Sequence, residues 1–157
     1  MVQIMRVLIR NSIKAIIIEN NKILLTKNKD ESGIFYLLPG GGQEPGENMK
    51  DALRREVYEE TGAEIYINDI KYVREYIGVN HEFSEYDEDV HQIEYMFICQ
   101  LKNISDNQVS EPDSMQIGIE WMKMDNIETC RIYPKILKSL LMKDGLIEEK
   151  VYLGDIN

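Results

Sequence analysis

Residues 39–63, PGGGQEPGENMKDALRREVYEETGA, form the stretch that is most informative about the fold. A glycine-rich loop here leads into an acidic helix. We expect the helix to begin near Asn48, because asparagine is a favoured N-cap. We expect it to end at Thr61 and Gly62, because glycine readily adopts the left-handed conformation that stops helices.

Three glutamates, Glu56, Glu59 and Glu60, share one face near the end of this expected helix. At about 100° per residue they fall within one arc, and as neighbouring anions they repel one another. They also lie in the last turn, where the helix dipole favours cations. Conflicts of this kind are expected at functional sites, and a hard cation such as Mg²⁺ would relieve both. The alternative is a solvated acidic face.

The spacing of these residues and of the nearby glycines matches a known family motif. The motif is G-x5-E-x7-R-E-U-x-E-E-x-G-U, where U is a bulky aliphatic residue, and only the register that starts at Gly41 fits. The matching positions are Gly41, Glu47, Arg55, Glu56, Val57, Glu59, Glu60, Gly62 and Ala63. Ala63 is small for the last aliphatic position. On these residues the chain resembles the Nudix (MutT-like) hydrolases.

The resemblance implies an α/β (α+β) fold, with a mixed β-sheet sandwiched between helices, and we expect residues 1–157 to form one Nudix domain. Residues 13–18 are almost continuously apolar, which is typical of a strand covered on both faces. Asn20 and Asn21 then favour a tight turn. We expect polar loops at 28–33 and 80–89, further strands at 34–38, 65–79, 90–102 and 117–124, a helix after Pro134 that stops at Asp144-Gly145, and a short strand in the tail 146–157.

The resemblance also implies a reaction and a cofactor. Nudix hydrolases cleave a nucleoside diphosphate linked to another group X, here with Mg²⁺ as the expected cofactor and Mn²⁺ as a substitute. By this resemblance Glu56 and Glu60 are the principal metal ligands, and Glu59 is a further ligand or the base. The backbone carbonyl of Gly40, before the first glycine of the motif, is expected to join the metal shell.

The other charged and glycine positions of the motif have structural roles in the family. Glu47 and Arg55 are therefore expected to tie the loop to the helix by an ion pair, and Gly41 and Gly62 to shape the backbone. Outside the motif, Lys14 could reach a phosphate, with a solvated sheet edge as the alternative.

One acid outside the helix is also a candidate. In the expected strand 90–102, Glu94 shares a face with Met96 and Ile98, and a half-buried carboxylate needs a partner. We assign Glu94 as the further base or ligand that Nudix enzymes often carry outside the motif, with an exposed rim position as the alternative. The acidic loop 80–89 is either a solvated surface loop or a flap on the substrate side, and it supplies the rivals Glu82, Glu85 and Glu88.

Composition limits the classes of partner. The chain has 157 residues and a net charge of −10 without a Lys/Arg cluster, which argues against binding a nucleic-acid polymer. A signal peptide and an apolar run of membrane-spanning length are both missing from the sequence. We expect a cytoplasmic protein with no membrane partner, and a homodimer from family habit.

The identity of X stays open at this level. Nucleoside triphosphates, ADP-ribose, nucleotide sugars and a non-nucleotide diphosphate all remain candidates for the small phosphorylated substrate. The alternative to an enzyme is a Nudix scaffold that senses a nucleotide or ADP-ribose without cleaving it. Such modules usually lose carboxylates of the motif, whereas this chain keeps Glu47, Glu56, Glu59 and Glu60.

Overall fold

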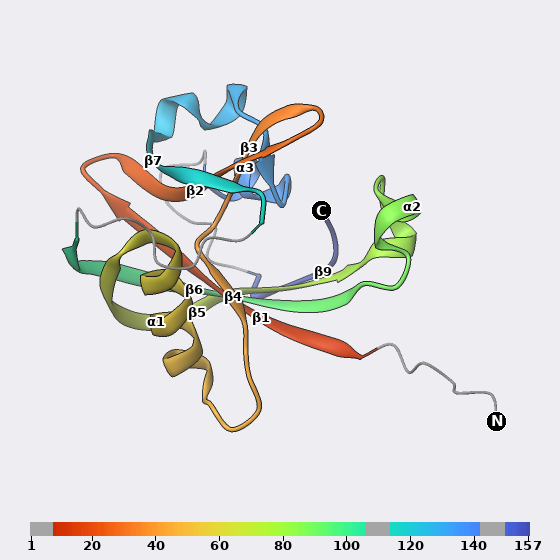
Figure 1. The fold of residues 1–157 in the computed structure, drawn as a ribbon, viewed down its shortest axis with the longest axis horizontal. Helices are drawn as coiled ribbons and strands as arrows, with labels where there is room; N and C mark the ends of the chain where they lie inside the picture. Colours follow the sequence, from red (N-terminus) through yellow and green to blue (C-terminus); the bar gives the residue numbers. More distant parts are fainter. Residues whose placement is uncertain (1–7, 106–113, 142–149) are drawn as a thin grey trace.

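The computed structural model describes residues 8–105, 114–141 and 150–157, which form a mixed sheet with a few short helices (Figure 1). The strands are β1 (Ile9–Glu19), β2 (Lys22–Asp30), β3 (Gly33–Leu37), β4 (Gly40–Gly42), β5 (Ala63–Ile77), β6 (His91–Ile104), β7 (Gln116–Lys123), β8 (Ile132–Tyr133) and β9 (Tyr152–Asp155). The α-helices are α1 (Met49–Thr61), α2 (Ser84–Asp87) and α3 (Ile136–Leu141), and the 3₁₀ helices are η1 (Gly78–Asn80) and η2 (Met124–Thr129).

The described strands join in one sheet whose order is β8-β3-β2-β1-β6-β5-β9, with β4 paired to β1 and β7 paired to β2. The pairs β1–β6, β3–β8 and β5–β9 are parallel, and the other pairs are antiparallel. The sheet is therefore mixed, as expected. No helix in the described residues is long and apolar enough to cross a membrane.

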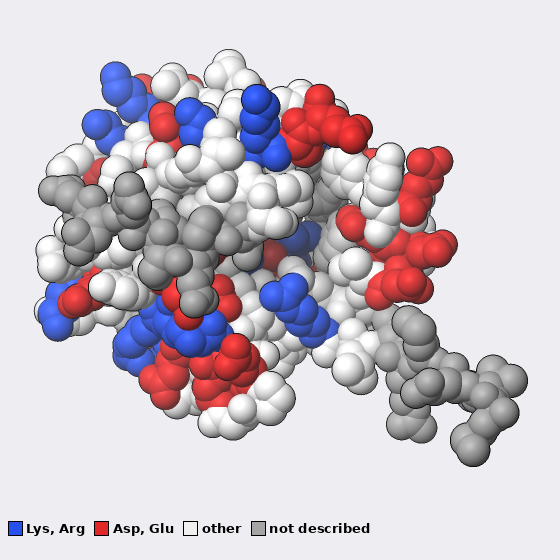
Figure 2. Space-filling view, viewed as in Figure 1, with Lys and Arg blue, Asp and Glu red and all other residues white. Residues whose placement is uncertain are grey.

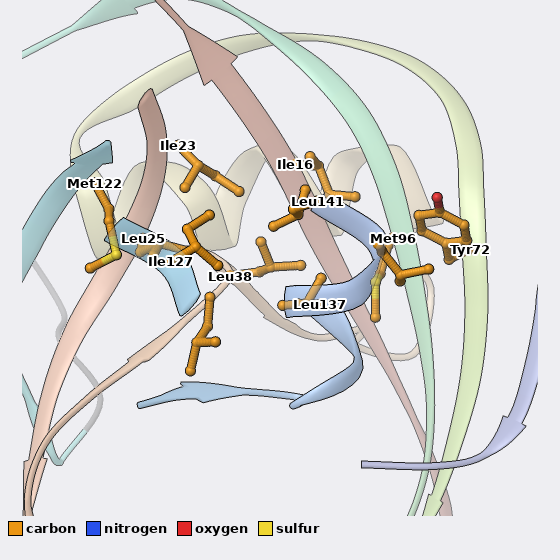
Figure 3. Packing of buried hydrophobic residues seen from close by; sticks show 12 residues of the cluster. Ile16, Ile23, Leu25, Leu38, Tyr72, Met96, Met122, Ile127, Leu137 and Leu141 are labelled. Carbon is orange, nitrogen blue, oxygen red and sulfur yellow. The ribbon is translucent and has the colours of Figure 1, made fainter. Parts of the chain in front are cut away.

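Strand β1 is the centre of the molecule and is covered on both faces. Ile13, Ala15 and Ile17 are buried in a cluster with residues of α1, whereas Ile16 belongs to a second cluster with residues of α3. Figure 3 shows Leu137 and Leu141 packed close to Ile16 in that second cluster. The two helices thus cover opposite faces, which confirms the predicted sandwich (Figure 1).

Helix α1 has the predicted ends. The Asn48 side chain accepts a hydrogen bond from the Asp51 backbone N–H at 2.9 Å, and Gly62 has a left-handed φ of 73°. The buried face of the helix carries Leu53 and Val57, both fully buried in the cluster on that side of the sheet. Packing of this face and the two caps together position the acidic last turn.

The glycine run differs from the expected loop. Gly40–Gly42 form a short strand antiparallel to Ser12–Lys14. The contact is so close that a Cβ on Gly40 would lie 2.0 Å from the Ile13 carbonyl oxygen. Gly40 therefore lets this backbone approach β1, and the contact depends on a partner strand that the local sequence does not reveal.

Some strand boundaries also differ from those predicted from the sequence. Strand β2 continues to Asp30, because Asn28–Asp30 pair with β3, so most of the expected loop 28–33 is strand. The expected strand region 65–79 is one long strand with register shifts, residues 63–77, and η1 follows it. Asn20 and Asn21 both have positive φ in the predicted turn, and β9 is the predicted strand of the tail. The expected helix stop at Asp144-Gly145 lies outside the described residues.

Candidate active site

Arg55 on α1 is the hub of the site. Its guanidinium donates to both carboxylate oxygens of Glu47, at 2.7 and 3.1 Å, and to the Gly42 carbonyl at 3.1 Å. Its Nη1 also donates to Glu56 Oε1 at 2.9 Å and to Glu59 Oε2 at 3.3 Å. The predicted ion pair of Glu47 and Arg55 is present, and it extends to two further carboxylates of the motif.

The electrostatics of this pair follow from the hydrogen bonds. The Arg55 guanidinium lowers the pKa of the Glu47 carboxyl, with help from the Glu44 backbone N–H. The same bond to Glu47 raises the pKa of Arg55 further above its usual value, against the effect of burial. A fixed cation beside Glu56 and Glu59 offsets part of the repulsion between the glutamates on this helix face.

Glu60 lies deeper than the other carboxylates. It is only 4% exposed, and its Oε1 accepts a hydrogen bond from the Gly40 backbone N–H at 2.7 Å. Its own backbone carbonyl accepts from Gln116 Nε2 at 2.8 Å. The end of α1 is thus connected to β4 on one side and to β7 on the other.

Glu56 lies against the glycine strand. A Cβ placed on Gly41 would approach Glu56 Oε2 to 2.5 Å, so glycine leaves room for this carboxylate in the position it occupies. The requirement agrees with the structural role that the resemblance assigns to Gly41. Glu56 and Glu60 consequently face the same short strand, one beside Gly41 and the other at Gly40.

The chemistry of these donors suits a hard divalent cation, because carboxylate and carbonyl oxygens are its preferred ligands. The missing Cβ of Gly41 lets the Glu56 carboxylate lie directly against β4, close to the Gly40 carbonyl. The Gly40 carbonyl accepts a hydrogen bond from Lys14 Nζ at 3.1 Å, and a carbonyl oxygen has a second lone pair. Within the described residues, no three His, Cys, Asp or Glu side chains lie together as a group that could hold a metal ion. Glu56 and Glu59 each bond Arg55 instead.

A cavity of about 340 Å³ opens beside this strand. Its lining comes from β1, β3, β4, β5, β6, the α2 region and the segment around β8: Arg10, Ser12, Lys14, Leu37, Leu38, Gly40, Gly41, Arg74, Tyr76, Phe83, Asp87, Val90, Gln92, Glu94, Tyr133, Pro134 and Asn157. Arg10, Ser12 and Lys14 alternate along β1 and share the face of Ile16. In Figure 2, acidic side chains gather over α2 on the right, and basic side chains lie nearer the centre of this face.

Glu94 lines this cavity, and its partner is an arginine. The side chain is 3% exposed and accepts from Arg74 Nε at 3.1 Å and from Arg74 Nη2 at 3.3 Å. Arg74 also donates through Nη1 to the Ile156 carbonyl at 2.7 Å. The partner that a carboxylate on this strand needs is thus supplied by β5, and Glu94 does not lie on an exposed rim.

The three rivals in the acidic loop lie elsewhere. Glu82 pairs with Lys135 at 2.6 Å and accepts from Asn157 at 3.1 Å, and Glu85 and Glu88 are exposed on and next to α2. The carboxylate from this loop that lines the cavity is Asp87.

Sequence reasoning missed Arg10, Arg74 and Asp87. The spacing of Arg10 and Lys14 by four residues on one strand was the available signal for a basic face. For Arg74 and Asp87 no local signal existed, because each contributes through pairing between segments distant in sequence.

Comparison with known proteins places this geometry in a family. The NUDIX domain model matches residues 9–140. The nucleoside triphosphatase NudI of Enterobacter sp. (strain 638) is 33% identical over 125 residues, covering 76% of this chain and 86% of that protein. The NudI protein of Salmonella schwarzengrund is 39% identical over 85 residues, which cover 51% of this chain and 60% of that protein.

Solved structures show the same fold. A NUDIX hydrolase from Nitrosomonas europaea superposes with a TM-score of 0.65 at 21% identity, covering 78% of each chain. An ADP-ribose pyrophosphatase from Streptococcus suis has a TM-score of 0.64 at 18% identity, covering 93% of this chain and 98% of that one. At these identities the likeness extends to the fold alone, and it agrees with the mixed sheet between helices.

Proposed function

This chain belongs to the NUDIX family of hydrolases, and from that premise we propose that it hydrolyses nucleoside triphosphates with a divalent cation, Mg²⁺ first. The observation that carries the proposal is the cavity that Arg10 and Lys14 line together with Gly40 and Gly41. The same two glycines contact the α1 carboxylates Glu60 and Glu56. Cations at that position suit a chain of phosphates. The similarity to proteins named nucleoside triphosphatase supports the same substrate class.

The roles of the residues follow from their positions. Glu56 and Glu60 would hold the cation beside β4, with the Gly40 carbonyl as a further oxygen ligand and Glu59 as ligand or base. When bound there, the cation would neutralise phosphate charge and make a water molecule more acidic. Lys14 and Arg10 would bind phosphate oxygens, and Arg55 would hold Glu56 and Glu59 in orientation.

The proposed reaction is the hydrolysis of a phosphoanhydride bond. Water attacks one phosphorus of the diphosphate, and the bond from that phosphorus to the bridging oxygen breaks. A nucleoside triphosphate thereby gives a nucleoside monophosphate and pyrophosphate. We keep Glu94 as the proposed acid outside the motif, and Arg74 fixes the orientation of its carboxylate at the cavity wall.

The test is product release from a panel of nucleoside triphosphates, oxidised guanine nucleotides, ADP-ribose, NADH, nucleotide sugars and diadenosine polyphosphates. Each compound is measured with Mg²⁺, with Mn²⁺ and with chelator. We expect turnover of triphosphates that requires the cation and falls by several orders of magnitude in Glu60→Gln. Glu31→Gln, in an exposed turn outside the cavity lining, is the matched control and should keep full activity.

Two results would overturn the proposal. Turnover of ADP-ribose or a nucleotide sugar without turnover of any triphosphate would assign a different X. Tight binding of a nucleotide without cleavage of any compound would instead favour the sensing module, and the intact carboxylates would then serve a ligand-dependent metal site.

A further inference from the structure

The cavity has two chemically different parts. Near β4 its charged side chains are the cations Arg10 and Lys14. Around α2 the lining changes to aromatic rings and acceptors, among them Phe83 and Asp87. In Figure 1 α2 lies at the far end of β5 and β6 from α1. For a nucleotide whose phosphates lie near β4, this second part is where the base would lie.

Asp87 is held in place with one carboxylate oxygen left over. The Tyr76 hydroxyl donates to Asp87 Oδ2 at 2.8 Å. Burial raises the pKa of Tyr76, and the neighbouring Asp87 raises it further, so the phenol stays a donor. In the described part of the chain, Asp87 Oδ1 accepts no hydrogen bond. Oδ2 is therefore oriented by the protein and keeps a second lone pair, and Oδ1 is available to a ligand.

The backbone around Asp87 is also fixed. A Cβ on Gly78 would lie 1.8 Å from the Asp87 carbonyl oxygen, and the Gly78 N–H donates to the Val90 carbonyl at 2.9 Å. Residues 78–90, here named the flap, therefore fold back closely onto the end of β5.

The flap is further tied to the tail by Asp155. Its carboxylate accepts from the Ile77 N–H and from Asn80 Nδ2, each at 2.9 Å, and also bonds His81 Nε2. Because the flap is already ordered, Asp87 can bind a ligand without the entropy cost of ordering a loop.

Two amides of this part each use one of their two N–H donors within the protein. Gln92 Nε2 donates to Glu94 at 3.4 Å, and Asn157 Nδ2 donates to Glu82 at 3.1 Å. Their amide oxygens, like Asp87 Oδ1, are left as acceptors. Phe83 and Tyr133 pack edge to face with centroids 5.7 Å apart and supply an aromatic wall on which a base can stack. Asp87 Oδ1 is the charged acceptor of this part, so a base that presents N–H donors to it fits here.

We propose that Asp87 reads the base and selects guanine, an inference that rests on the function proposed above. Guanine presents two adjacent donors, N1–H and the N2 amino group, which match a carboxylate. Adenine and cytosine offer a single amino group on that edge, and uracil offers one N–H between two carbonyls. A site built to accept hydrogen bonds rejects analogues that cannot donate them, because its polar groups would be left unpaired.

The first experiment compares kcat/KM for GTP, ITP, ATP and UTP. ITP is the sharpest probe, because it differs from GTP only by lacking the N2 amino group. We expect GTP to exceed ITP by about ten- to a hundredfold, the size expected for a hydrogen bond to a charged group. Asp87→Asn should bring the GTP/ITP ratio close to one. Asp89→Asn, the same change at an exposed flap residue outside the cavity lining, should leave the ratio unchanged.

The second experiment measures binding without turnover. Calorimetric titration with non-hydrolysable GTP and ITP analogues should show the same preference, and Gly78→Ala should reduce it by displacing the Asp87 backbone. Equal affinities for the two analogues in the native protein, or a preference that survives Asp87→Asn, would overturn the proposal. Turnover of all triphosphates without base preference would refute Asp87 as the reader and leave the triphosphatase intact. Guanine-selective binding without cleavage would support Asp87 as the reader and refute the triphosphatase activity.

Discussion

At the scale of single residues, Arg55 explains how the acidic face of α1 is tolerated. One guanidinium bonds Glu47, Glu56 and Glu59 together with the Gly42 carbonyl. Arg54, the other basic residue at this place in the helix, pairs instead with the exposed Asp51 at 3.2 Å. The two adjacent arginines thus have different tasks, which their sequence context alone does not distinguish.

Arg55→Lys tests the hub. A lysine keeps the charge but is a compact ammonium that cannot span several carboxylates in the fixed fork geometry of a guanidinium. We expect kcat/KM to fall by about 10- to 100-fold, as for other residues that orient metal ligands, and the cation concentration for half-maximal activity to rise. Steady-state kinetics over a cation titration measures both. Arg54→Lys should behave like the native protein; equal losses in both variants would contradict the assignment.

Asp30 gives a pH-dependent prediction at the same scale. It bonds Arg131 through both oxygens, at 2.7 and 2.8 Å, and this bond lowers the Asp30 pKa below its usual 3.8. A depressed pKa stabilises the folded state above the unfolded pKa, and the contribution disappears as pH falls through the folded value. The Tm difference between the native protein and Asp30→Asn should therefore be full above about pH 5 and shrink below pH 4. Thermal unfolding from pH 7 to pH 2.5 measures this difference.

Exposed Asp69→Asn is the comparison for that series. It should show little difference in Tm from the native protein at any pH. A Tm difference for Asp30→Asn that stays constant down to pH 2.5 would argue against an ionised pair with Arg131.

At the scale of elements, local rules predicted α1 better than they predicted the strands. The helix begins after the expected cap and stops at the expected glycine. The Gly40–Gly42 segment, by contrast, became a strand, because it pairs with Ser12–Lys14 about thirty positions earlier. Cap chemistry is read within a few residues, whereas strand pairing is a long-range contact.

Asn48→Ala tests the cap. Removing the hydrogen bond to the Asp51 N–H leaves a helix donor without its partner and should reduce the free energy of unfolding by about 1 kcal/mol. Urea denaturation measures the change. Asn68→Ala, at an exposed position in β5, is the matched control and should stay within about 0.5 kcal/mol. A loss for Asn48→Ala no greater than that of the control would show that packing alone sets the start of α1.

At the scale of the whole molecule, one sheet separates two apolar clusters that share the central strand β1. The α1 cluster carries the carboxylates on its helix. The cavity is lined by Gly40 and Gly41, which contact Glu60 and Glu56 of that helix, and by residues of β1 on the face that carries Ile16. Since both clusters depend on the same strand, neither should unfold alone, in line with the expectation of a single domain.

This shared strand predicts one cooperative transition. Trp121 packs against the α1 cluster and reports that side, whereas far-UV ellipticity reports the helices and strands together. The urea midpoints from the two signals should coincide. Reaction of the Cys99 thiol is a second probe. Burial raises the pKa of this thiol to about 12, so it should react only when the protein unfolds in the same transition. Separate midpoints would indicate two independent units.

The sequence by itself determined the ends of α1, the acidic face that marks the family and the strand buried on both sides, because caps, helical spacing and apolar runs act over a few residues. Only the tertiary structure decided which partners the charged groups take. Arg74 and Glu94 pair because the β5–β6 register sets them opposite each other, and Asp87 reaches the cavity because the flap folds back at Gly78. Such contacts join positions far apart in the chain, and their geometry exists only once the strands have paired.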